Sequence, residues 1–255
     1  MTDATDDRII IALDFDRRAE AEALVDRLGD ACGFYKVGLE LLTAAGPDLV
    51  RELVSRGHGV FLDLKLFEIP NSVAGAVRAA GSLGASMVTV HAMGGTGILT
   101  AAARAAREFP GLKVLALTVV TSMTGNDLAD IGIAAGTDEQ VLRLARLAVD
   151  AGCDGVIAAP RETGPLRRLL GPERLIVTPG VRLSAGVPPG GGPRGGEAPD
   201  GAPAGAETGD ETGADARAGT AGAAFAAGAS YVVVGRSVTR AADPLAALRR
   251  IAAGG

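Results

Sequence analysis

Short apolar segments recur along the chain, and each is followed by a longer stretch with the 3.6-residue period of an amphipathic helix. The apolar segments are rich in β-branched residues and show little alternation, which is typical of parallel strands buried on both faces. We predict strands at residues 9–14, 34–38, 59–63, 86–91, 113–118, 155–158, 174–178 and 231–235. We predict helices at residues 17–29, 40–56, 71–84, 97–108, 138–150, 163–170, 220–227 and 243–252.

Repeated strand-then-helix units in 255 residues predict an α/β protein, a (β/α)8 TIM barrel forming a single domain over residues 1–255. A doubly wound sheet is the alternative, but it would place a glycine-rich turn after the first strand. That strand ends with Leu13 and Asp14 and is followed by Phe15 and Asp16 instead. Residues 184–219 are mostly Gly, Pro, Ala, Asp and Glu, and we interpret them as a low-complexity mobile loop between the seventh strand and its helix.

Composition and charge narrow the possible partners. The net charge of −5 gives no general attraction for nucleic acids or membrane surfaces, so we expect neither as a partner. The N-terminal residues do not resemble a signal peptide, and no apolar run approaches the length of a membrane span. Cys32 and Cys153 have no metal-ligand spacing and suit a reducing compartment. We therefore expect a cytoplasmic protein.

Charged residues stand where the first three predicted strands end. Asp63 and Lys65 are two residues apart, so in a regular strand both would point to one face. A structural salt bridge is the simpler interpretation of this pair alone. However, active sites of (β/α)8 barrels lie at the carboxyl ends of the strands, where Asp14 and Lys36 would also lie. The four side chains would then alternate in charge, which favours the ionised form of each.

A second group of residues predicts a phosphate site. Pro179 and Arg182 follow the seventh strand, and Gly235 and Arg236 follow the eighth. In this fold the loops after these two strands commonly bind phosphate through backbone N–H groups and a cation. Glycine permits close approach of the backbone, and arginine can donate to two phosphate oxygens at once. The sequence therefore predicts a small phosphorylated substrate.

The segment Asp63-Leu64-Lys65-Leu66-Phe67-Glu68-Ile69-Pro70-Asn71-Ser72 resembles the D-x-K-x-x-D-I-P-N-T signature of the orotidine 5′-monophosphate decarboxylase family. Other blocks of that family occur in order, including V-T-P-G-V-R at residues 177–182 and V-G-R at residues 234–236. The resemblance covers the chain outside residues 184–219. It implies decarboxylation of orotidine 5′-monophosphate to UMP in pyrimidine biosynthesis, without a metal or an organic cofactor, by a homodimer.

The resemblance also implies roles for individual residues. Lys65 would be the proton donor, and Asp63 would lie beside the carboxylate that leaves. Lys36 would contact the ribose, and Glu68 would reach the active site of the partner subunit. The remaining residues that the resemblance assigns to substrate binding are Asp14, Ile69, Ser72, Thr121, Pro179, Arg182, Gly235 and Arg236.

Three departures from the family pattern leave alternatives open. Glu68 stands where the family has Asp, and Ser72 where it has Thr. Asp215 falls at the position of a glutamine in the phosphate loop, and that loop is enlarged. One alternative is therefore a nucleotide-binding paralogue with weak or altered decarboxylase activity. Another is a related decarboxylase of phosphorylated sugar acids, which would use magnesium.

Overall fold

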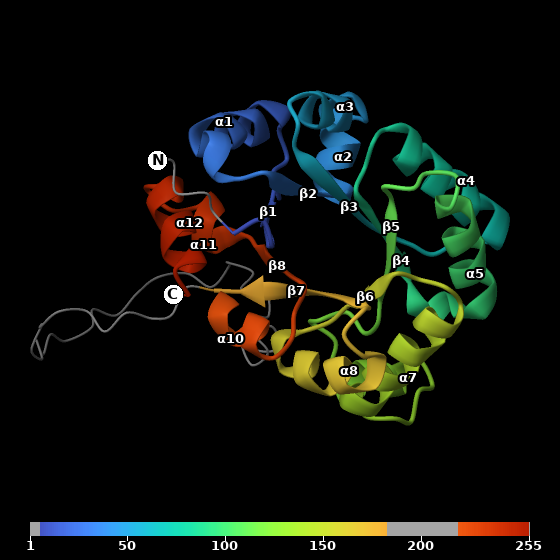
Figure 1. Ribbon diagram of the computed structural model, residues 1–255. Coiled ribbons are helices and arrows are strands. Elements are labelled where there is room, and N and C mark those ends of the chain that lie inside the picture. The colour runs from blue at the N-terminus through green and yellow to red at the C-terminus, as the bar shows by residue number, and fades with distance from the viewer. Residues whose placement is uncertain (1–5, 183–218, 255) are drawn as a thin grey trace, which may run out of the picture.

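A computed structural model describes residues 6–182 and 219–254, in which the strands form a closed, all-parallel barrel (Figure 1). Each strand pairs with the next along the chain, and β8 pairs with β1, with Ile10 opposite Val233. The predicted (β/α)8 barrel is confirmed. The strands are β1 (Ile9–Ala12), β2 (Phe34–Gly38), β3 (Gly59–Leu66), β4 (Met87–His91), β5 (Lys113–Leu117), β6 (Gly155–Ile157), β7 (Leu175–Val181) and β8 (Tyr231–Val234).

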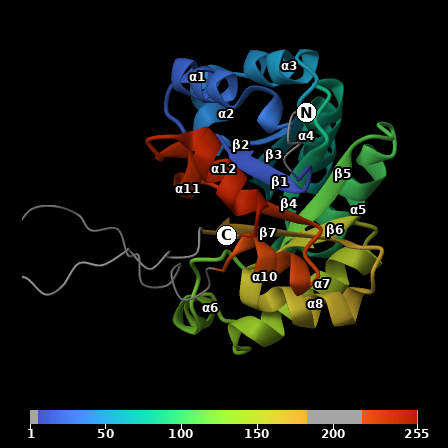
Figure 2. The ribbon, with the colours of Figure 1, turned by 60° about the vertical axis from the view of Figure 1, so that its left-hand side comes forward.

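Helices surround the barrel, as two views of the ribbon show (Figures 1 and 2). They follow the strands in the alternating order that the sequence predicts. The α-helices are α1 (Arg18–Leu28), α2 (Leu39–Ala45), α3 (Asp48–Ser55), α4 (Pro70–Ser82), α5 (Gly95–Ala106), α6 (Gly125–Asp130), α7 (Thr137–Asp150), α8 (Thr163–Leu170), α10 (Ala221–Ala226), α11 (Arg236–Thr239) and α12 (Pro244–Ala252). Short 3₁₀ helices are η1 (Gly29–Ala31), η2 (Ala92–Gly94) and η3 (Pro160–Glu162).

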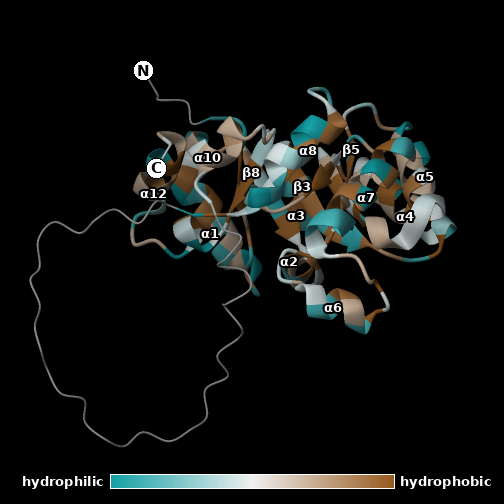
Figure 3. Ribbon diagram, turned by 90° about the horizontal axis from the view of Figure 1, so that it is seen from below, coloured by the Kyte–Doolittle hydropathy of each residue, from teal (hydrophilic) through white to brown (hydrophobic). Residues whose placement is uncertain are grey.

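The core has two layers, one inside the barrel and one between the barrel and its helices. Along β1, Ile10 and Ala12 belong to the inner layer, whereas Ile9 and Ile11 belong to the outer layer. Because both faces of the strand are covered, all four residues are buried. This explains why the strands are almost continuously apolar in sequence. Figure 3 shows the hydrophobic strands enclosed by helices of mixed polarity.

The predicted helices differ from the structure at three places. The single helix predicted over residues 40–56 is two helices, α2 and α3, because Gly46 adopts a positive φ of 73° and Pro47 then forms the N-cap of the next helix. The short helix α11 was not predicted, and neither was helix α6. A capping box starts it, in which Thr124 and Asp127 each bond the backbone of the other, and this sequence signal was available.

The end of β3 departs from regular strand geometry. Leu62 pairs with Val88 on β4, but the next pair is Leu66 with Val90. Residues 63–65 therefore bulge out of the ladder, and Lys65 has a φ of 49°, the one positive φ at a non-glycine residue in the described chain. The strand is therefore not regular here, but Asp63 and Lys65 still point into the same cavity and form the expected pair.

The ends of the segment that we predict to be a mobile loop are joined on the barrel. Val181 forms a parallel bridge with Gly219, and the amide of Arg182 donates to the carbonyl of Gly219 at 2.9 Å. Residues 183–218, including Asp215, lie outside the described residues. The mobile loop and the single-domain assignment therefore stay predictions.

Within the described ranges, no helix combines the length and the apolar character needed to cross a bilayer.

Candidate active site

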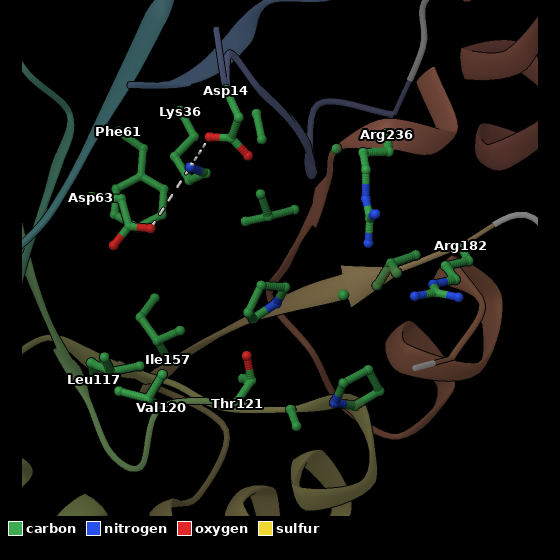
Figure 4. A pocket seen from close by; sticks show the side chains of 18 of the residues that line it. Asp14, Lys36, Phe61, Asp63, Leu117, Val120, Thr121, Ile157, Arg182 and Arg236 are labelled. Carbon is green, nitrogen blue, oxygen red and sulfur yellow. Dashed lines mark hydrogen bonds and ion pairs between the residues drawn. The ribbon is translucent and has the colours of Figure 1, made fainter. Parts of the chain in front are cut away.

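A cavity of about 340 Å³ opens at the carboxyl ends of the strands (Figure 4). Its wall takes residues from the strands themselves and from the loops that follow them. Such an opening is where (β/α)8 enzymes carry their active sites. The predicted site residues that line it are Asp14, Lys36, Asp63, Lys65, Thr121, Pro179, Arg182, Gly235 and Arg236.

The four charged residues from the ends of the first three strands form a continuous chain on one side of the cavity. Lys36 Nζ lies 2.8 Å from Asp14 Oδ1 and 3.8 Å from Asp63 Oδ2. Lys65 Nζ lies 2.9 Å from the same oxygen of Asp63. The side chains of Lys36 and Asp63 are only 11% and 15% exposed, so their attraction is weakly screened by water. The predicted alternation of charges is confirmed.

Two arginines lie where β7 and β8 reach the cavity. Arg182 directly follows β7, and Arg236 is the first residue of α11, two positions after the end of β8. Figure 4 shows both across the cavity from Asp63. Both arginines are exposed, and Gly235 precedes Arg236 at the start of α11. A dianion bound here would meet two guanidinium groups.

An apolar surface lies between the two charged regions. Phe61, Leu117 and Ile157 project from the inner layer of the core into the cavity, and Val120 extends this surface beyond β5. Thr121 adds a hydroxyl beside them. Sequence reasoning had missed these apolar residues because it searched the strand ends for polar groups. The signal available in the sequence was their position near the carboxyl ends of strands, among the side chains that alternate into the barrel interior.

Comparison with known proteins assigns the chain to a family. The model of the "Orotidine 5'-phosphate decarboxylase / HUMPS family" matches residues 7–251. The chain belongs to this family. The relationship that the sequence motifs predict is therefore confirmed.

Relatives within the orotidine 5′-phosphate decarboxylase family match over nearly their whole lengths. A protein of that name from Moorella thermoacetica is 46% identical over 254 residues, which cover 97% of this chain and 91% of the relative. Another from Anaeromyxobacter sp. (strain K) is 44% identical over 97% of this chain and 98% of the relative. A crystal structure of orotidine 5′-phosphate decarboxylase from Lactobacillus acidophilus is similar with a TM-score of 0.78 at 33% identity, covering 96% of this chain and 97% of that one.

Three predicted site residues of this family member lie outside the cavity of their own chain. Glu68 and Ile69 are in the loop between β3 and α4, and Ser72 is in the first turn of α4. All three are exposed. Hydrogen bonds from the Ser72 hydroxyl and the Ile69 amide lower the pKa of Glu68, which favours a carboxylate at neutral pH. The segment thus presents a negative charge at the surface beside the barrel opening.

His91 lies next to the charged chain, at the end of β4. Its Nδ1 accepts a hydrogen bond from the backbone amide of Met93 at 3.3 Å, and its ring packs against Phe67 with centroids 5.7 Å apart. Burial lowers the pKa of His91, and the positive charge of Lys65 lowers it further. A neutral imidazole is therefore favoured near pH 7.

The carboxylate, thiol and imidazole groups of the described residues do not form the cluster that a metal ion requires. Within residues 6–182 and 219–254, no three His, Cys, Asp or Glu side chains gather closely enough to hold one. In the cavity, the carboxylates of Asp14 and Asp63 are each paired with lysines instead.

Proposed function

We propose that this protein decarboxylates orotidine 5′-monophosphate to UMP. The observation that carries the proposal is the layout of the cavity: two arginines on one side, the Asp-Lys-Asp-Lys chain on the other, and an apolar surface between them. A nucleotide monophosphate has a dianion at one end and a flat base at the other. Membership of the family and the names of the relatives support the same assignment.

Each part of the substrate has a matching part of the cavity. Arg182, Arg236 and the backbone at Gly235 would hold the phosphate, with Pro179 beside them. The pyrimidine would lie against the apolar surface, where the hydroxyl of Thr121 can bond its polar edge. Phosphate binding far from the reacting carbon supplies binding energy that can be used to desolvate the reacting end.

The chemistry would take place at Asp63 and Lys65. The bond from the pyrimidine ring to its carboxylate breaks, carbon dioxide leaves, and the electron pair stays on the ring carbon. The ammonium group of Lys65 stabilises this negative charge and then donates a proton to the same carbon. Asp63, 2.9 Å from Lys65 Nζ, holds that ammonium group in place. Lys36, shared between Asp14 and Asp63, would bond the ribose hydroxyls.

The decisive experiment measures loss of the ultraviolet absorbance of orotidine 5′-monophosphate, with purified protein and EDTA. Turnover that is abolished by Lys65→Ala supports the proposal. Binding of UMP without turnover would instead indicate a nucleotide-binding paralogue. Turnover of a phosphorylated sugar acid only after magnesium is added would indicate the related decarboxylase of phosphorylated sugar acids.

We further propose that the protein acts as a homodimer in which Glu68 completes the active site of the partner subunit. Glu68 is exposed and lies between two exposed apolar side chains, Phe67 and Ile69, which are 61% and 62% exposed. Leu39, which lines a depression beside Asp14 and Lys36, is 57% exposed. Large apolar side chains exposed together mark an interaction surface.

Mixing two inactive variants tests this arrangement. In a dimer of one Lys65→Ala and one Glu68→Ala subunit, one site would have both intact residues if Glu68 crosses the interface. Random mixing would then restore about one quarter of the wild-type sites, because half of the dimers are mixed. If Glu68 acts within its own chain, mixing would restore nothing. A single sedimenting species of monomer mass would also refute the proposal.

A further inference from the structure

The bulge at the end of β3 contains Asp63 and Lys65, two of the charged residues of the cavity, and its backbone is unusual. Three consecutive residues, Asp63 to Lys65, lie opposite the single residue Thr89 of β4. Lys65 has a φ of 49°, a conformation that L-residues with a side chain rarely adopt. Such a conformation persists where the surrounding structure over-determines it, and it commonly occurs at functional sites.

The hydroxyl of Thr89 connects this bulge to β4. The backbone amide of Lys65 donates to Thr89 Oγ1 at 2.8 Å, and Thr89 Oγ1 donates to Asp63 Oδ1 at 3.0 Å. An amide can only donate and a carboxylate can only accept, so the single hydroxyl hydrogen must point to Asp63. Thr89 is completely buried, and water cannot readily replace either bond.

The two bonds determine both partners of the ion pair. One bond holds the Lys65 backbone in its left-handed conformation. The other holds Oδ1 of Asp63, which leaves Oδ2 facing Lys65 Nζ at 2.9 Å and Lys36 Nζ at 3.8 Å. The position of the Lys65 ammonium group therefore depends on Thr89 from two directions, through its own backbone and through Asp63.

We propose that Thr89 is a positioning residue that aligns Lys65 and Asp63 for the reaction. Its effect on turnover rests on the proposed decarboxylase function. Thr89 need not touch the substrate, and it does not line the cavity. It acts through the bulge, so its loss should affect the reacting state more than substrate binding.

The test compares Thr89→Val, which keeps the shape and removes the hydroxyl, with Thr89→Ser, which keeps the hydroxyl. A misplacement of about 1 Å at a reacting group can cost on the order of 100-fold, so we expect kcat of Thr89→Val to fall about 10- to 100-fold. KM should change far less, since the phosphate contacts are intact. Thr89→Ser should restore most of kcat. If Thr89→Val does not fold, Thr89→Ala replaces it with the same expectation.

Thr163→Val is the matched control. Thr163 is also completely buried, and its hydroxyl bonds another buried hydroxyl, that of Thr178, at 3.2 Å. We expect its thermal stability to fall as that of Thr89→Val does, while kcat stays within about twofold of wild type, because the reacting groups keep their positions. An equal loss of kcat in both variants would show that Thr89 is merely structural and would overturn the proposal.

Hydrogen exchange separates failure of this proposal from failure of the decarboxylase function. The amide of Lys65 should exchange slowly in wild type and in Thr163→Val, and much faster in Thr89→Val. Unchanged exchange in Thr89→Val would overturn the positioning role whatever the substrate. If exchange accelerates but wild type does not decarboxylate orotidine 5′-monophosphate, the proposed function fails and the role of Thr89 in holding the bulge stands.

Discussion

Replacing Arg167 with methionine should destabilise the barrel without changing its chemistry. Arg167 lies on α8, at the end of the barrel opposite the cavity. Its guanidinium group donates to the carbonyl of Gly228 at 2.8 Å, to that of Gly171 at 2.6 Å and to that of Arg174 at 2.8 Å. It also donates to the hydroxyl of Ser230 at 3.1 Å. One side chain therefore joins α8 to the segments that enter β7 and β8.

The expected loss follows from these bonds. Hydrogen bonds to a charged group contribute about 1.5–3 kcal/mol each when buried. Arg167 is half-buried, so water would replace part of this network, and we expect a total loss of about 3 kcal/mol. Methionine retains most of the apolar stem, so the loss reports mainly on the bonds. For a chain of this size, this corresponds to a decrease in Tm of roughly 6–12 °C.

Urea denaturation followed by circular dichroism, with the same measurement on Arg168→Met, tests this magnitude. Arg168 is the exposed neighbour on the same helix, and we expect its replacement to cost less than about 0.5 kcal/mol. Values of kcat per folded molecule should match wild type in both variants, since the cavity lies at the other end of the barrel. Equal, small losses in the two variants would refute the structural role of the Arg167 network.

Two further predictions concern the cavity. Burial lowers the pKa of both histidines of the chain, and the charge of Lys65 lowers that of His91 further, so both should titrate below 6.5 in NMR spectra. Lys65→Met should then raise the pKa of His91 and leave the pKa of His58 unchanged. A change in both pKa values would contradict a specific effect of the Lys65 charge on His91. Arg236→Ala should raise KM for orotidine 5′-monophosphate by about 10- to 150-fold, equivalent to one charged hydrogen-bond contact. Arg240→Ala, on the next turn, should leave KM near wild type in the same assay.

Sequence patterns predicted the barrel well because each strand is buried on both faces and each helix on one. This burial pattern dictates residue types over whole segments, so eight strands were located to within a few residues. The division at Gly46 and Pro47 was visible in the sequence but was outweighed by the apolar period around it. Local signals of two residues are easily overridden in this way.

The candidate site was predicted as a set of residues but not as a geometry. Asp63 and Lys65 were paired by assuming a regular strand, whereas a bulge brings them together. The bulge depends on Thr89, which is 24 positions from Lys65 in the sequence, and no local propensity encodes such a contact. The apolar surface at Leu117 and Ile157 likewise depends on contacts between residues far apart in the sequence, because the fold places the ends of their strands around one cavity.

The two-layer core has a consequence for how the protein tolerates substitutions. On β3, Val60 and Phe61 are fully buried in the two layers, and two residues later the same strand carries Asp63 and then Lys65. Along β3, the residues that stabilise the barrel and those that carry charge into the cavity are therefore separated by a distance of about 10 Å. Variation at the cavity end can alter the substrate while the apolar end keeps the barrel folded, so new specificities can arise from this scaffold without a new fold.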